Sequence, residues 1–123
     1  MKTNENTVLS FSHDSDLLLQ REVALRSGGF EVISVNTESQ ACFEIEMGRC
    51  GVLLICYTAS VGTIQDLAKL FRRRCPTGSI VFVMNRTDES VPEGFDHTVP
   101  DSAGPEAIVQ VLRSGLYPES QAS

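Results

Sequence analysis

The stretch Gly51–Gly62, GVLLICYTASVG, contains the most hydrophobic run of the chain, Val52–Cys56. A short, continuous apolar run between turn residues is typical of a β-strand that is covered on both faces. The run ends at Cys56, continues through a loop of small and hydroxylic residues, and leads into a helix. In an open α/β sheet, ligands and chemistry are found at this junction, at the carboxyl end of a central strand. Cys56 therefore occupies the position that we expect to decide the activity.

Strand and helix patterns alternate on both sides of this stretch. The sequence predicts three further buried or half-buried strands of apolar and β-branched residues and a short fifth one, over Thr7–Phe11, Phe30–Val35, Ser79–Met84 and Asp96–Val99. Capping residues and a helical spacing of apolar side chains predict four helices, from Asp14 or Ser15 to about Ser27, from Asn36 or Thr37 to Gly48, from Ser60 or Thr63 to Arg74, and from Pro105 onward.

This alternation predicts a parallel sheet with helices on both faces and right-handed crossovers. Five such strands favour a flavodoxin-like three-layer sandwich with the strand order 2-1-3-4-5. The link Asn85–Gly94 has only ten residues and contains Pro92, so the fourth helix of such a fold is expected to be missing or stunted. We expect a single domain over residues 1–123, with a core over about 7–116 and polar tails over 1–6 and 117–123.

Composition limits the function. The chain has 123 residues, 41% of them hydrophobic, and a formal net charge of −6. An acidic protein lacks the positive field that nucleic acids and anionic membranes require, so we expect neither as a partner. The polar start MKTNENT has no apolar leader segment, which favours a cytoplasmic protein. Without an export signal, the four cysteines are expected to be free thiols: Cys42, Cys50, Cys56 and Cys75.

Two features outside the strand ends are candidates for interaction. Arg72, Arg73 and Arg74 form the only basic cluster, although three arginines in a last helical turn also complement the helix dipole. Phe43 and Met47 form an apolar pair one turn apart, off the inward face of their helix. Arg21 interrupts the apolar stripe of the first helix, and we interpret it as an arginine whose stem packs while its charged end reaches water.

The segments VLSFSHDSDLL, LRSGGFEV, VLLIC and SIVFVM, in this order, resemble the receiver (CheY-like) domain of bacterial response regulators over about residues 7–116. The resemblance implies a phosphoryl transfer from a histidine kinase to an aspartate that ends the third strand. It also implies a magnesium ion held by acidic residues after the first strand. A hydroxyl residue after the fourth strand and a lysine after the fifth then sense the phosphate.

Each of these positions departs from the family pattern. Cys56 stands at the phosphoacceptor position, and Ser12 and His13 stand at the acidic pair, with Asp14 one residue late. Met84 stands at the hydroxyl position and Asp101 at the lysine position. The resemblance therefore implies a degenerate receiver, a stand-alone module without enzymatic activity, cofactor or metal, which binds another signalling protein of a two-component-type system. The oligomeric state is left open.

Two alternatives use Cys56. CYTASVGT is similar to the phosphocysteine loops of sugar-transport IIB proteins and low-molecular-weight phosphatases, in which backbone amides and a helix N-terminus cradle phosphate. A thiol or metal sensor could instead combine Cys56 with His13 and, as a further ligand, His97 or Asp101. Against an activated thiol, no lysine or arginine is near Cys56 in sequence, and Asp14 and Asp101 would raise its pKa.

Overall fold

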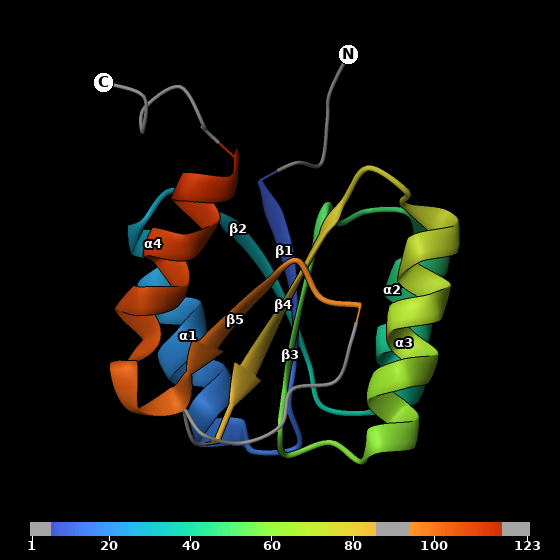
Figure 1. Ribbon diagram of the computed structural model, residues 1–123, viewed down its shortest axis with the longest axis horizontal. Helices are drawn as coiled ribbons and strands as arrows, with labels where there is room; N and C mark the ends of the chain where they lie inside the picture. The colour runs from blue at the N-terminus through green and yellow to red at the C-terminus, as the bar shows by residue number, and fades with distance from the viewer. Residues whose placement is uncertain (1–5, 86–93, 117–123) are drawn as a thin grey trace.

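Figure 1 shows the computed structural model, which describes residues 6–85 and 94–116. Within these ranges the chain forms five β-strands, four α-helices and one 3₁₀ turn. The elements follow in the order β1 (Thr7–Phe11), α1 (Ser15–Ser27), β2 (Glu31–Val35), α2 (Glu38–Met47), β3 (Val52–Cys56), α3 (Val61–Arg74), β4 (Ser79–Met84), β5 (His97–Pro100), η1 (Asp101–Ala103) and α4 (Pro105–Leu116).

The five strands form one parallel sheet in the order β2-β1-β3-β4-β5, which confirms the predicted flavodoxin-like topology. The register pairs Phe11 with Ile55, Cys56 with Val83, and Met84 with Pro100. The carboxyl ends of the strands therefore meet at one edge of the sheet, at the bottom of Figure 1. The last residues of β1, β3 and β5 and the loops that follow them lie along this edge.

Helices α1 and α4 cover one face of the sheet, and α2 and α3 cover the other (Figure 1). All five residues of β3 are buried, as expected for a strand between two helical layers. Alternate residues of β3 join different cores. Leu53 and Ile55 pack with α2 and α3, whereas Val52, Leu54 and Cys56 pack with α1 and α4.

Local sequence signals explain where the helices begin and end. The carboxylate of Asp14 caps α1, the hydroxyl of Thr37 caps α2, and the hydroxyl of Ser60 caps α3. Gly48 ends α2 with φ 71°, a left-handed conformation that glycine adopts without steric cost. None of the described helices is both long and apolar enough to cross a membrane.

The predicted bounds need two small corrections. β2 begins at Glu31 rather than Phe30, and β5 covers His97–Pro100 rather than 96–99. Most of the link in which we expected a missing or stunted helix, residues 86–93, lies outside the described residues, as do the predicted tails apart from Asn6. Asn85 and Gly94, the two ends of the link, are not helical, and neither are residues 95 and 96.

Candidate functional site

The candidate site lies at the carboxyl edge of the sheet, where three strand ends bring polar residues together. Cys56 ends β3, Ser12 follows β1, and Asp101 follows β5. Cys56 and Ser12 have no exposed surface, and Arg21 of α1 is only 2% exposed. A buried site with a thiol, a hydroxyl and a guanidinium group needs an account of how each polar atom is satisfied.

Hydroxyl groups connect the thiol to the start of α1. The Cys56 sulfur lies 3.0 Å from Thr58 Oγ1, which in turn lies 3.3 Å from Ser12 Oγ. Ser12 Oγ also accepts a hydrogen bond from the Asp14 backbone N–H at 3.0 Å. The thiol is thus at the end of a short polar chain rather than in a purely apolar environment.

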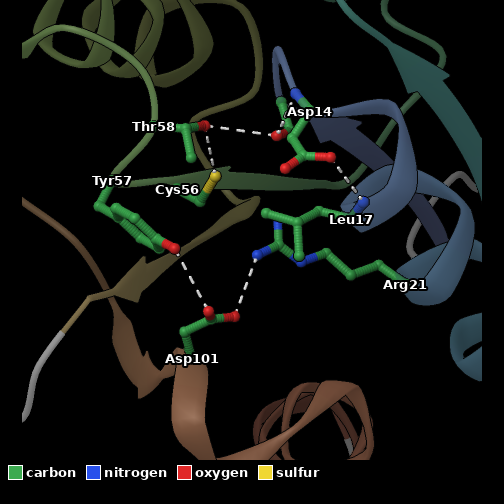
Figure 2. Close-up of polar contacts among 8 residues, drawn as sticks. Asp14, Leu17, Arg21, Cys56, Tyr57, Thr58 and Asp101 are labelled. Atoms are coloured by element: carbon green, nitrogen blue, oxygen red, sulfur yellow. Dashed lines mark hydrogen bonds and ion pairs between the residues drawn. The ribbon is translucent and has the colours of Figure 1, made fainter.

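Arg21 does not behave as predicted. Its side chain does not reach water but turns into the site, so that its guanidinium lies between Cys56 and Asp101 (Figure 2). The contact to Asp101 Oδ1 is an ion pair at 3.6 Å, and neither Nη1 nor Nη2 has a hydrogen-bond partner in the described chain. A cavity of about 10 Å³ next to Arg21 could hold at most one water molecule.

The Arg21 guanidinium changes the chemistry expected of Cys56. Burial raises the pKa of the thiol, but the neighbouring Arg21 guanidinium and the hydroxyl and backbone N–H of Thr58 stabilise the thiolate more strongly, so the pKa of Cys56 is lowered. The expectation of a raised pKa was therefore wrong. It considered the neighbours of Cys56 along the chain, whereas the cation comes from α1.

Asp101 is shared between two partners. The Tyr57 hydroxyl donates to Asp101 Oδ2 at 3.3 Å, while Oδ1 faces Arg21 (Figure 2). Burial and the Asp101 carboxylate raise the pKa of Tyr57. The positive charge beside Asp101 thus comes from Arg21 of α1.

The remaining acid near the site, Asp14, accepts hydrogen bonds from backbone N–H groups. Asp14 Oδ1 accepts from the backbone N–H groups of Asp16 at 2.9 Å and of Leu17 at 3.3 Å, which is the cap of α1. His13 is exposed, and its Nδ1 lies 3.1 Å from the Asn36 carbonyl oxygen. Neither side chain is directed at a metal position beside Cys56.

Met84 does not belong to the site. It is buried in the core between the sheet and α2 and α3, whereas Cys56 faces α1 and α4. A side chain at the end of β4 can point to either face of the sheet. The prediction that Met84 lies at the hydroxyl position of the site, beside Cys56, is therefore wrong.

The residues do not fit the magnesium ion that the receiver resemblance implies. Among the described residues, no three His, Cys, Asp or Glu side chains are arranged to hold a metal ion. His97 also begins β5, at the opposite edge of the sheet from Cys56, so it cannot complete a site there. The phosphocysteine alternative finds no support either, because α3, whose N-terminus would cradle phosphate, packs on the opposite face from Cys56.

Of the three candidate arginines at the end of α3, two form ion pairs within the described chain. Arg72 donates to the Gly94 carbonyl at 2.8 Å and pairs with Asp96 at 3.0 Å. Arg74 pairs with Glu46 at 2.6 Å, and Arg73 is exposed. Two of the three arginines therefore hold the α3 end to neighbouring segments.

Two exposed apolar pairs remain on the helices. Phe43 and Met47 of α2 are 55% and 53% exposed, as predicted for a pair off the inward face. Leu19 and Val23 of α1, which the sequence analysis did not single out, are 62% and 59% exposed and line a groove between α1 and α4. Their i, i+4 spacing was the signal that could have identified them.

Sheet order, layers and the position of the site define a flavodoxin-like domain with the topology of a receiver. Solved structures of this class are similar to the chain. The chemotaxis response regulator CheY4 of Vibrio cholerae has a TM-score of 0.74 at 18% identity, with 87% of this chain and 95% of that chain covered. A CheY-like receiver domain protein from Methanospirillum hungatei has a TM-score of 0.77 at 15% identity, with 96% and 98% covered.

A putative pilus assembly-related protein from Burkholderia pseudomallei is also similar, with a TM-score of 0.71 at 15% identity and coverage of 92% of this chain and 90% of that one. Comparison with known protein families finds no match, and comparison with curated proteins finds none. Likeness at these identities establishes the receiver fold, and the function has to be argued from the residues of the site.

Proposed function

We propose that this chain is a pseudo-receiver, a protein-interaction module of a two-component-type signalling system that works without phosphorylation and is not an enzyme. One observation supports this proposal above the others. Each carboxylate near the strand ends already has a partner, since Asp14 caps α1 and Asp101 contacts Arg21 and Tyr57. Cys56 stands where the phosphoacceptor would be.

Phosphoryl transfer to a receiver requires a carboxylate acceptor and a divalent cation that neutralises the charge of the transferred group. Ser12 provides a buried hydroxyl and His13 an exposed imidazole in place of the acids that would hold the cation. The Arg21 charge would also repel a cation from the space beside Cys56. These substitutions act together, so restoring any one of them leaves the transfer chemistry incomplete.

We expect no phosphorylation when the protein is incubated with a small phosphodonor and magnesium. The intact mass should stay unchanged, because the described site offers neither an unengaged carboxylate nor a cation site. An ordinary receiver treated in parallel serves as the control and should gain one acid-labile phosphoryl group. An aspartyl phosphate found on this chain by peptide mapping would contradict the proposal.

The module needs a surface for its partner, another signalling protein, and we propose the Phe43/Met47 pair of α2. Both side chains are more than half exposed and lie one helical turn apart. Such a pair can anchor a partner through apolar contact, because it does not have to break internal ion pairs. Arg72 and Arg74 would have to give up theirs.

The double substitution Phe43→Ser/Met47→Ser is expected to weaken binding of a partner captured from the native cell by about tenfold or more. Leu19→Ser/Val23→Ser on α1 is the matched control, because its two side chains are also more than half exposed and have the same i, i+4 spacing. Titration of each variant against the captured partner measures the difference. Equal affinities for the α2 variant and the parent chain would rule out this surface. Weaker binding in the α1 variant alone would show that the partner binds at the α1/α4 groove instead.

A further inference from the structure

Arg21 presents an unusual combination of burial and missing partners. The residue is 2% exposed, and both terminal nitrogens of its guanidinium lack a hydrogen-bond partner within the described chain. Asp101, its nearest carboxylate, is 3.6 Å away and itself about one-third exposed. A buried guanidinium normally has its donors satisfied and a negative charge close by. The site therefore has capacity for one more negative group.

Cys56 is placed to supply that negative group. Its sulfur lies on the face of the sheet that α1 and α4 cover, and the positive charge of Arg21, which comes from α1, acts on it. Thr58 Oγ1, at 3.0 Å from the sulfur, offers a hydroxyl that can donate to it. A thiolate at Cys56 would be stabilised by the positive charge of Arg21 and by a hydrogen bond from the Thr58 hydroxyl. Activated cysteines are stabilised in the same way.

We propose that Cys56, with Arg21 and Thr58 beside it, is an oxidation site that reacts with hydrogen peroxide to form a sulfenic acid. This inference goes beyond the proposed interaction module, because it gives the module a chemical input at the position where receivers carry phosphate. It does not depend on that function, since an oxidisable thiol can exist on a chain with or without a signalling partner.

The reaction balances with peroxide as the oxidant. The thiol first releases its proton to solvent, and the thiolate sulfur then attacks one peroxide oxygen. An S–O bond forms while the O–O bond breaks, so sulfur is oxidised by two electrons and the peroxide is reduced. The departing hydroxide takes up a proton and leaves as water. Arg21 stabilises the negative charge that moves from sulfur to the departing oxygen.

Burial restricts which oxidant can react. Cys56 has no exposed surface, and the hydrogen-bonded Tyr57 and Asp101 side chains lie next to the site (Figure 2). Reaction therefore requires a transient local opening at the strand ends. A molecule as small as hydrogen peroxide needs the smallest opening, whereas bulky alkylating reagents need a larger one.

The other cysteines provide an internal comparison. Solvent accessibility and local charge predict different cysteines as the first to be oxidised. Cys42 and Cys75 are partly exposed, so accessibility alone favours their oxidation. The pKa of Cys42 is raised by burial and by Glu38, and burial raises the pKa of Cys50 to about 12. Among Cys42, Cys50 and Cys56, only the pKa of Cys56 is lowered by an arginine.

The test treats the whole chain with hydrogen peroxide near neutral pH and quenches it at intervals in denaturant that contains dimedone. Peptide mass spectrometry then measures the sulfenic acid at each cysteine. We expect Cys56 to react first, although it is the least exposed. Arg21→Met should slow its oxidation by about tenfold, and Arg21→Lys, which keeps the charge, should restore part of the rate. Earlier reaction of Cys42 or Cys75, or an unchanged rate in Arg21→Met, would overturn the proposal.

A second measurement uses the unaltered site. The thiolate absorbance near 240 nm is titrated with pH in the parent chain and in Cys56→Ser, and the difference reports the ionisation of Cys56 alone. We expect the midpoint below about 8.5, the value for an unperturbed cysteine. A midpoint above it would overturn the proposal whether or not the Arg21 variants fold, and Thr58→Val, which removes the neutral donor, should move the midpoint upward.

Discussion

Replacing Arg21 by methionine should increase the free energy of unfolding by about 2 kcal/mol. The expectation follows from the cost of a guanidinium that is 2% exposed and has two terminal nitrogens without hydrogen bonds. Methionine retains much of the apolar stem and removes the buried charge. Asp101 does not become an isolated buried charge, because about a third of its side chain is exposed and the Tyr57 hydroxyl still donates to it.

Urea unfolding of Arg21→Met and the parent chain measures this change, provided that both have the same m-value. Arg26→Met is the control on the same helix, because Arg26 is half exposed, pairs with Glu22 at 3.0 Å and donates to the Val32 carbonyl at 3.0 Å. Loss of these satisfied contacts should lower the free energy of unfolding by about 1–2 kcal/mol, the opposite sign to Arg21→Met. If Arg21→Met were instead destabilised by about 3 kcal/mol or more, the Arg21–Asp101 pair would be a net stabilising interaction.

The stability and the reactivity of the site thus depend on the same unsatisfied guanidinium. A variant that is more stable and oxidises more slowly at Cys56 would connect the two. Such a trade-off is common where a site keeps a charge that the fold alone does not require.

Most of the fold could be predicted because its signals are local. Val52–Cys56 is a continuous apolar run, Thr37 and Ser60 are capping residues, and Gly48 is a left-handed stop. Each of these acts over a few residues, and the alternation of strands and helices leaves few allowed topologies. The strand order followed from the pattern without any knowledge of side-chain contacts.

The site could be predicted only in part, because its decisive contact is not local. Cys56 and Arg21 come from β3 and α1, and the sequence does not show that a helix side chain reaches the end of a strand one layer away. The available signal was Arg21, a charged residue within the otherwise apolar stripe of α1. Such a residue usually reaches water with its charged end, but Arg21 is buried. Met84 was misplaced for a related reason, since the face on which it lies depends on the register of β4.

A second large effect, on the pH dependence of stability, is expected from Cys50. This residue lies between α2 and β3 and is 4% exposed. Burial, followed by the proximity of Cys75 and Glu44, raises its pKa to about 12 in the folded chain. In the unfolded chain a cysteine ionises near pH 8.5. The folded state therefore keeps the proton over a range in which the unfolded state has released it.

The stability that this difference contributes is fully present below about pH 8.5 and is lost as the pH rises toward the folded-state pKa. Between pH 8 and pH 11, the free energy of unfolding should fall by about 3 kcal/mol through Cys50 alone. Urea unfolding at the two pH values measures the fall, and Cys50→Ala should remove that part of it. Cys42→Ala, which removes a half-buried thiol with a smaller rise in pKa, should leave most of the pH dependence in place. An equal pH dependence in the parent chain and in Cys50→Ala would show that the Cys50 thiol becomes ionised without unfolding of the core.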